Sequence, residues 1–427
     1  FWLKGKFNSP KRLSASVGSL GRASGKMMKA EQFTHNYSAL FGIVGLILLS
    51  PILVPLLAII SVFVLIWSIA FSFLKARYRI KVPGDMLLPK PESLTVKSWD
   101  GLSLNCWTFK ALADVEDVDY TSSKKNKVVL LCNPLGAKGF TMYAPIIAVC
   151  TELYGADTTF ICWDYRGFFE SDNPKRVRSI DVRNHAQDAA EVLKAVVGED
   201  RCADVVVGHS MGVQVALEFA LLYPEMVGAM ILLNGTFGHA LQTGFQPILK
   251  LPYAGDLNRA FISWMLKKKN GEAMEFIRSS LEPFVGMFFA ILSRLFGSKS
   301  LEKCLGKDYM LKQWNAYLGG ICSNTKTMKA FLRGYQDLDA HTVAHHLDQL
   351  EHPTLLYAGL WDVFTPAYNM ATMKRNMQNS RLVVDLFSSH FSVLEHPERV
   401  MGEVQHFLKK EIRAYRRMKS TKFVKFE

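Results

Sequence analysis

The sequence lacks the cysteine patterns of several protein classes. Its seven cysteines include no Cys-x-x-Cys pair and are widely spaced, at positions 106, 132, 150, 162, 202, 304 and 322. This spacing fits no zinc finger, and the odd number argues against a disulfide framework. Several cysteines lie in apolar runs, where a cysteine is most often a small buried hydrophobic residue. We therefore expect a reducing compartment. Metal-dependent and cofactor-dependent chemistry have no support elsewhere in the sequence, so we expect neither a metal nor a cofactor.

The sequence also has little that indicates nucleic-acid binding, although its formal net charge is +13. It contains no RNP-like motif and no dense block of basic and aromatic residues. The positive charge gathers within residues 4–29, 75–81 and 413–425. Basic residues beside an apolar segment favour anionic lipid headgroups. We expect the membrane as a partner, and no nucleic acid; ordinary solvation of the charges is the alternative interpretation.

Residues 38–74 contain no charged side chain at all. One helix needs about 20 apolar residues to cross a bilayer, so this run is long for one crossing and slightly short for two. Pro51 and Pro55 would either kink one tilted helix or turn a hairpin that returns to the same face. Basic residues on both flanks favour the hairpin, because positive charge prefers the cytoplasmic side. Both arrangements stay open, and both predict a membrane anchor.

The segments around this anchor carry no catalytic motif. Residues 1–37 are basic and serine-rich, which predicts disorder, although an organelle transit peptide has a similar composition. The chain begins at Phe1 rather than methionine, so we expect a fragment or a processed form. A linker is predicted over 75–91 and a basic tail over 412–427. We expect the folded domain to face the cytosol, with the endoplasmic reticulum and the lipid-droplet surface as candidate membranes.

The central motif is Gly208-His209-Ser210-Met211-Gly212. A β-branched run precedes it and apolar residues at helical spacing follow it, which predicts a strand, a tight turn and a helix. Glycines beside such a turn remove Cβ atoms that would clash, so Ser210 would be exposed at the end of the strand. The Met211 amide, first in the helix, would face an oxyanion formed there. The motif predicts a nucleophilic serine.

Strands and helices alternate along residues 92–411. Two strands joined at Asp100-Gly101 predict a hairpin. Further strands are expected at 128–132, 159–163, 205–207, 229–233, 353–359 and 380–387, and helices over 142–153, 180–197 and 397–409. This alternation predicts an α/β fold with a mainly parallel sheet and helices on both faces.

The order of these elements, an Asp-x-Arg-Gly motif at 164–167 and the serine motif together resemble the α/β-hydrolase superfamily. The resemblance covers residues 92–411 and implies a helical cap inserted at about 236–340. In that superfamily a His-Gly turn after the third strand supplies a second oxyanion amide. Here the turn reads Asn133-Pro134-Leu135, so by position the donor would be the Leu135 amide, since proline has no amide hydrogen.

A serine hydroxyl is a poor nucleophile at neutral pH, so a histidine must accept its proton and a carboxylate must orient that histidine. The superfamily places them in the order serine, acid, histidine. Asp362 follows one predicted strand and His390 follows the last one, which matches that order. The resemblance implies a catalytic triad of Ser210, Asp362 and His390, with the Met211 and Leu135 amides as the oxyanion hole.

Other polar residues are predicted to be structural. His209 is expected not to act as a base. We interpret His341, His345 and His346 as a solvated helix face rather than metal ligands, because no cysteine or carboxylate set completes a site. Glu395, shortly after the predicted base, is assigned no role.

The resemblance, the apolar cap and the anchor together indicate the substrate. We expect a membrane-anchored serine esterase or lipase that cleaves carboxylic esters, of lipids above all, through an acyl-enzyme on Ser210. Two alternatives stay open, an acyltransferase that uses the same triad and a catalytically silent membrane scaffold. The sequence indicates neither an acyl-chain preference nor an oligomeric state.

Overall fold

The computed structural model describes residues 91–110, 126–155, 157–175, 180–244, 253–267, 272–276, 279, 297–299, 301–302 and 306–411. All of them belong to the C-terminal unit of the chain, Ala76–Glu427. The predicted segments 1–37 and 38–74, the linker except its last residue, and the tail at 412–427 lie outside these residues. None of the helices within the described ranges is both long and apolar enough to cross a membrane.

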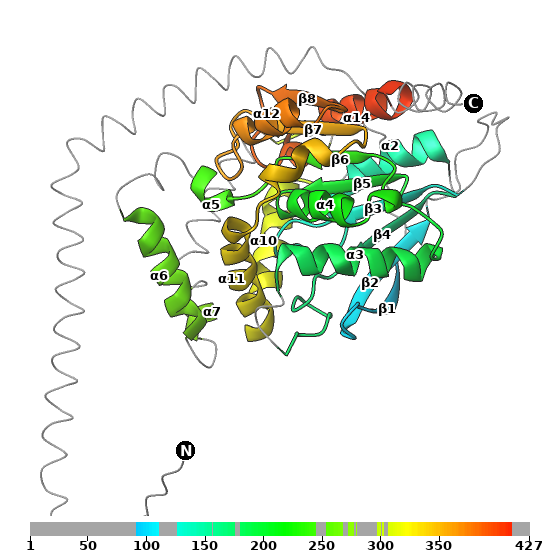
Figure 1. Ribbon diagram of the computed structural model, residues 1–427. Helices are drawn as coiled ribbons and strands as arrows, with labels where there is room; N and C mark the ends of the chain where they lie inside the picture. Colours follow the sequence, from blue (N-terminus) through cyan, green and yellow to red (C-terminus); the bar gives the residue numbers. More distant parts are fainter. Residues whose placement is uncertain are drawn as a thin grey trace, which may run out of the picture. The chain divides into compact units, whose positions relative to one another are not determined.

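An eight-stranded sheet forms the centre of the described fold (Figure 1). Its strands are β1 (Glu92–Lys97), β2 (Ser103–Lys110), β3 (Val128–Cys132), β4 (Thr159–Trp163), β5 (Val205–His209), β6 (Met230–Leu233), β7 (Thr354–Gly359) and β8 (Ser380–Asp385). Their spatial order is β1-β2-β4-β3-β5-β6-β7-β8. Strand β2 pairs antiparallel with β1 and β4, and every pair from β4 to β8 is parallel. The predicted α/β fold with a mainly parallel sheet is confirmed.

Helices cover both faces of the sheet. On one face lie α3 (Val182–Val197), α4 (Met211–Leu222) and α12 (Ala367–Asn376), and on the other lie α2 (Ala144–Tyr154) and α14 (Pro397–His406). Successive strand residues point to opposite faces. Leu130 and Val206 therefore join the cluster under α3 and α4, whereas Val129 and Val205 join the cluster under α2 and α14. Burial on both faces explains why these strands read as continuous apolar runs.

The short helices mostly connect these elements. They are η1 (Thr141–Tyr143), η3 (Pro224–Met226), η6 (Ala344–Gln349), α13 (Ser392–Glu395) and η7 (Phe407–Glu411). The last predicted strand, 380–387, ends at Asp385 instead. The reason is a turn, because the Asp385 side chain accepts a hydrogen bond from the Phe387 amide at 3.1 Å.

The Asp-x-Arg-Gly motif anchors the loop after β4. The Arg166 side chain is fully buried and donates to both carboxylate oxygens of Asp188 on α3, at 2.7 and 2.5 Å. It also pairs with Asp100 of the β1–β2 turn at 3.1 Å. A buried cation without partners would be strongly destabilising, and these two carboxylates remove that cost. The motif thus ties the hairpin to α3.

A group of helices lies between β6 and β7 in the chain, to the left of the sheet in Figure 1. They are α5 (Ala240–Thr243), α6 (Ala254–Lys267), α7 (Glu272–Phe276), α10 (Tyr309–Ile321) and α11 (Thr325–Ala340). Ile262 and Met265 of α6 pack against Met328 and Leu332 of α11. We call these helices the cap. Residues 280–296 of the predicted insertion lie outside the described residues.

Candidate active site

Ser210 occupies the tight turn between β5 and α4. Its backbone angles, φ 55° and ψ −119°, are unusual for a residue with a side chain. A Cβ atom on Gly208 would lie 2.4 Å from the Gly212 carbonyl oxygen, and one on Gly212 would lie 1.9 Å from the Cys132 carbonyl oxygen. Close backbone contacts therefore require glycine at both positions of the motif. The absence of a side chain at Gly212 lets the turn pack directly against the end of β3.

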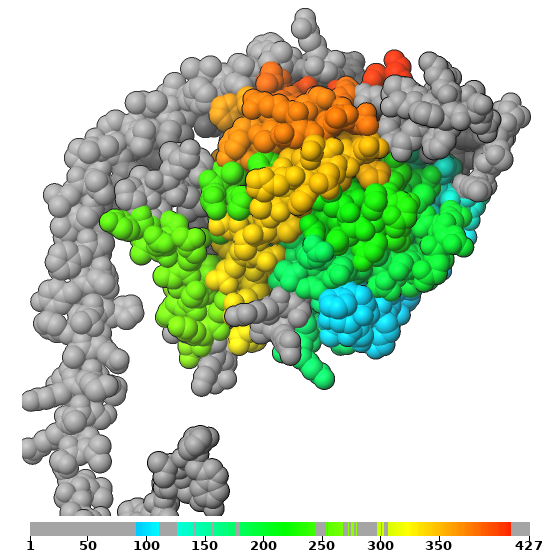
Figure 2. All heavy atoms as spheres, in the orientation of Figure 1, coloured from blue at the N-terminus to red at the C-terminus, as the bar shows by residue number. Residues whose placement is uncertain are grey.

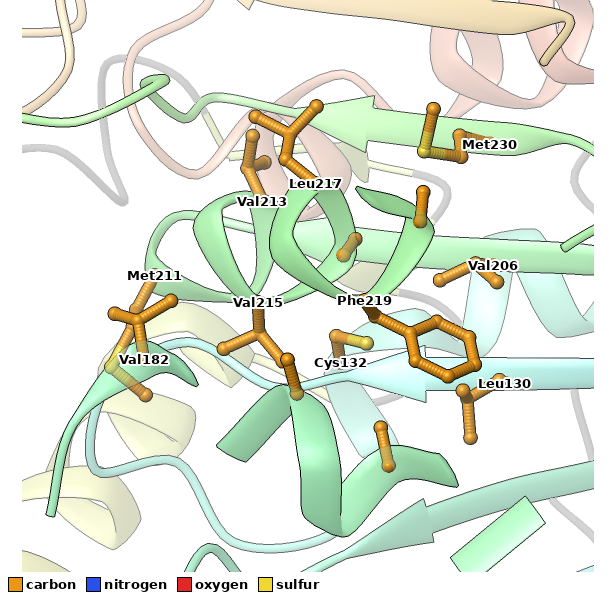
Figure 3. Close-up of a cluster of buried hydrophobic side chains, with 14 of the residues drawn as sticks. Leu130, Cys132, Val182, Val206, Met211, Val213, Val215, Leu217, Phe219 and Met230 are labelled. Atoms are coloured by element: carbon orange, nitrogen blue, oxygen red, sulfur yellow. The ribbon is translucent and has the colours of Figure 1, made fainter. Parts of the chain in front are cut away.

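The helix that follows Ser210 holds the turn in place. The helix α4 is buried from Met211 to Ala220. Figure 3 shows Val213 and Leu217 on the side of α4 toward the strand that carries Met230, and Val215 on the opposite side. Fully burying apolar side chains of this size contributes roughly 1.5–3 kcal/mol each. A turn fixed by such a helix does not need its own side-chain contacts to keep its strained conformation.

Asp362 lies in the loop after β7 and is 3% exposed. Its Oδ1 accepts hydrogen bonds from the Phe364 amide at 2.9 Å and the Thr365 amide at 2.8 Å. Its Oδ2 accepts from the Thr365 hydroxyl at 2.8 Å and from Asn234 Nδ2 at 3.1 Å. Four donors around two oxygens suit a carboxylate, which accepts hydrogen bonds and donates none.

His390 lies in the loop after β8, and its Nδ1 is 2.8 Å from Asp362 Oδ2. Because the carboxylate accepts there, Nδ1 carries the proton and Nε2 is left with a free lone pair, the state that a general base requires. The two loops meet because β7 and β8 are neighbours and because Gly359 leaves room. A Cβ atom on Gly359 would lie 2.3 Å from the Ser389 carbonyl oxygen.

His209 joins the serine turn to the histidine loop. Its Nε2 is 2.8 Å from the His390 carbonyl oxygen, and the two rings are 5.0 Å apart. Burial lowers the pKa of His209 to about 3, so its ring is neutral and Nε2–H donates to that carbonyl. His209 thus holds the two loops together, as a structural residue would. Within the described residues, Ser210 Oγ makes no hydrogen bond to His390, so this conformation does not contain that contact of the predicted triad.

The predicted oxyanion donors lie on the two chain segments that meet at Gly212. Met211 opens α4, and Leu135 is in the loop after β3, whose Cys132 and Asn133 carbonyls border Gly212. Among the described residues neither amide donates to a protein acceptor, so both are available to an oxyanion.

Three residues of this region were missed or set aside in the sequence. Asn234, after β6, and Thr365 hold Asp362, and the Thr365 hydroxyl oxygen also lies 2.7 Å from the Asn234 carbonyl oxygen. Glu395 is buried, and its carboxylate accepts from the amide and the hydroxyl of Ser389, each at 2.5 Å. Burial raises the pKa of Glu395 to about 7. In the sequence, the only feature that pointed to Glu395 was its position shortly after His390.

The prediction for the histidine trio was wrong for His341. Its ring is nearly buried, with Nε2 3.2 Å from Glu218 Oε2 and Nδ1 3.2 Å from Gln214 Nε2, so it ties the end of α11 to α4. His345 and His346 are exposed on η6, as predicted. Over the described ranges, no cluster of histidine, cysteine and carboxylate residues is arranged to hold a metal.

Residues 127–397 match the family described as alpha/beta hydrolase fold. The chain is 24% identical over 291 residues to a proline iminopeptidase from Saccharolobus solfataricus, covering 67% of this chain and 85% of that protein. It is 25% identical over 295 residues to 2-hydroxy-6-oxononadienedioate/2-hydroxy-6-oxononatrienedioate hydrolase 1 from Pseudomonas putida, covering 68% and 90%. A solved hydrolase from Pseudomonas aeruginosa is similar with a TM-score of 0.53 and 19% identity, covering 74% and 98%.

Proposed function

The chain belongs to the α/β-hydrolase family, which supports a serine hydrolase, and from that premise we propose that it is membrane-anchored and cleaves carboxylic esters of lipids. The observation that carries the catalytic part of this proposal is the hydrogen bond between Asp362 and His390. The hydrogen bond from His209, the neighbour of Ser210, to the His390 carbonyl connects the serine turn to the histidine loop. These groups come from three strand ends at one edge of the sheet.

In the proposed reaction, His390 takes the proton of Ser210 as the serine oxygen attacks the ester carbonyl carbon. The Met211 and Leu135 amides stabilise the negative charge on the carbonyl oxygen. The bond to the alcohol then breaks, and His390 gives its proton to the departing oxygen. Water, deprotonated by His390, then attacks the acyl carbon; the bond to the Ser210 oxygen breaks, that oxygen takes the proton back from His390, and the carboxylic acid leaves. Asp362 holds the imidazole throughout.

An apolar substrate is favoured by the surroundings of the base. The His390 ring contacts Phe364 at 5.0 Å and Phe391 at 5.3 Å between ring centroids, and Trp314 of the cap contacts Phe391 at 6.1 Å. Aromatic rings beside the base would pack against hydrocarbon and offer few partners to a charged group. The relatives act on chemically different substrates by their names, so the ester itself is the proposal of this article.

A lipid surface is favoured by the outward face of α6. Leu257, Phe261 and Trp264 follow one another at helical spacing and are 68%, 37% and 44% exposed, although the opposite face of α6 packs on α11. Figure 2 shows α6 in light green at one side of the described fold. A helix with apolar side chains on its outer face suits a bilayer interface. The charge-free residues 38–74 would hold the domain there.

The test uses the full chain in phosphatidylcholine vesicles that contain a long-chain acylglycerol or the matching fatty amide. We expect fatty acid to be released from the ester and not from the amide. Asp362→Asn should lower the rate about 10⁴-fold, because the histidine loses its tautomer and orientation. Asp348→Asn, an exposed isosteric change on η6, is the control and should leave the rate unchanged.

Three outcomes would contradict the proposal. Cleavage of the amide in preference to the ester would exclude the ester class. An added alcohol that captures most of the acyl groups would identify an acyltransferase. Release of the full chain from vesicles by alkaline carbonate would exclude the anchor.

A further inference from the structure

Tyrosine hydroxyls hold the peptide groups of the predicted oxyanion loop. The amide of Leu135 belongs to the peptide between Pro134 and Leu135. The carbonyl before it, that of Asn133, accepts from the Tyr165 hydroxyl at 2.8 Å, and the carbonyl after it, that of Leu135, accepts from the Tyr317 hydroxyl at 2.6 Å. Both peptides next to the donor are therefore fixed, and the donor between them has little freedom to rotate.

The two tyrosines come from different parts of the fold. Tyr165 follows β4 and belongs to the main core, whereas Tyr317 is on α10 of the cap, 182 residues from its acceptor in sequence. One side of the donor peptide is thus set by the sheet and the other by the cap.

The same cap helix also reaches the histidine loop. Trp314, one turn before Tyr317, contacts the Tyr317 ring at 4.9 Å and the Phe391 ring at 6.1 Å. Phe391 follows His390 and contacts its ring at 5.3 Å. Through two adjacent aromatic residues, α10 touches both the oxyanion loop and the neighbour of the base.

Glycines let the cap approach the oxyanion loop closely. A Cβ atom on Gly334 of α11 would lie 2.6 Å from the Leu135 side chain, and one on Gly136 would lie 2.9 Å from the Phe331 ring. Close packing at both points leaves little space for the loop to move independently of α10 and α11.

We propose that Tyr317 is a positioning residue that makes oxyanion stabilisation depend on the docked position of the cap. This rests on the proposed function, because it assigns the Leu135 amide to the oxyanion. When α10 is docked, the Tyr317 hydroxyl orients the Leu135 carbonyl and hence the adjoining amide. When α10 is displaced, the nucleophile and base remain but the second oxyanion donor is lost.

The test replaces the hydroxyl alone. Tyr317→Phe keeps the ring against Trp314 and removes the hydrogen bond to Leu135. We expect kcat for a short soluble ester to fall about 10- to 100-fold with KM within about twofold, since the lost contact acts on the transition state. Affinity for a boronic acid, which imitates the tetrahedral oxyanion, should fall by a similar factor.

The matched control is Tyr335→Phe on α11, which removes a cap hydroxyl that bonds to Asn258 of α6 instead of to a carbonyl of the predicted oxyanion loop. It should leave kcat and boronic-acid affinity unchanged. Equal losses in both variants, or a change in KM alone for Tyr317→Phe, would overturn the inference. Failure of the proposed function itself looks different, because the wild-type chain would then not react with a fluorophosphonate at Ser210.

Discussion

Asn234 gives the sharpest test of how the acid is held. Its side chain donates to Asp362 Oδ2 and to the Ser389 carbonyl, at 3.1 and 3.0 Å, and accepts from the Ser392 hydroxyl. Its backbone is left-handed, with φ 44°. Asn234→Ala would remove three buried hydrogen bonds, worth about 1 kcal/mol each, and add about 1 kcal/mol of backbone strain. We expect a loss of about 4 kcal/mol, a large part of the stability of a typical domain.

Two further substitutions separate these contributions. Asn234→Gly loses the same hydrogen bonds but tolerates a positive φ, so it should be about 1 kcal/mol more stable than Asn234→Ala. Asn234→Asp keeps the size but puts a second carboxylate beside Asp362. Like charges at this distance disfavour ionisation, so we expect the acid limb of the pH–activity profile to move to higher pH.

The measurements are thermal unfolding of the solubilised full chain and the pH dependence of ester hydrolysis. A loss of about 4 kcal/mol should lower the unfolding midpoint by about 10 °C. An Asn234→Ala variant that unfolds like the wild type would refute the buried network. A glycine variant no more stable than the alanine variant would refute the backbone part, and an unmoved acid limb in Asn234→Asp would refute the charge argument.

Two other predictions concern the serine turn and the buried acid. Gly212→Ala should abolish fluorophosphonate labelling of Ser210 and lower the unfolding midpoint, because the new Cβ would overlap the Cys132 carbonyl. The control is Gly319→Ala on α10, whose Cβ would meet no atom within 4 Å and which should change neither measurement. Equal effects of the two substitutions would contradict the close contact at Gly212. Glu395 binds its proton more tightly in the folded protein than in the unfolded chain, because burial raises its pKa to about 7. Its protonation therefore stabilises the folded state fully below about pH 4.5, and this contribution of about 3 kcal/mol is lost as the pH rises to about 7. Glu395→Gln should flatten the fall of the unfolding midpoint between pH 5 and 8 relative to wild type, and parallel curves would show that the acid is not buried as described.

The sequence was informative where function depends on a residue's place at the end of a strand. The β-branched run before Ser210 and the apolar runs before Asp362 and His390 predicted strands, and parallel strands in one sheet bring their carboxyl ends to one edge. The structure places all three residues there. The helix and strand boundaries shifted by a few residues, since capping and turn contacts such as that of Asp385 decide them.

The residues that support this site were not predictable in the same way. Asn234 reaches Asp362 across 128 residues of chain, because β6 lies between β5 and β7 in the sheet. Tyr317 is 182 residues from Leu135 in sequence, so its contact with the predicted oxyanion loop depends on how the cap packs. His341 was predicted to be solvated because its partner, Glu218, is on a helix 123 residues away in sequence. Such contacts depend on tertiary packing and leave no local pattern in the sequence.

The most direct test of the central claim is to trap the acyl-enzyme. The full chain is mixed with a long-chain ester, quenched in acid after milliseconds to seconds, and digested for mass spectrometry. The account predicts the mass of the acyl group on the peptide that contains Ser210, loss of that adduct in Ser210→Ala, and much slower acylation in His390→Ala. Hydrolysis of the ester with no adduct on Ser210, or an adduct on another residue, would contradict it.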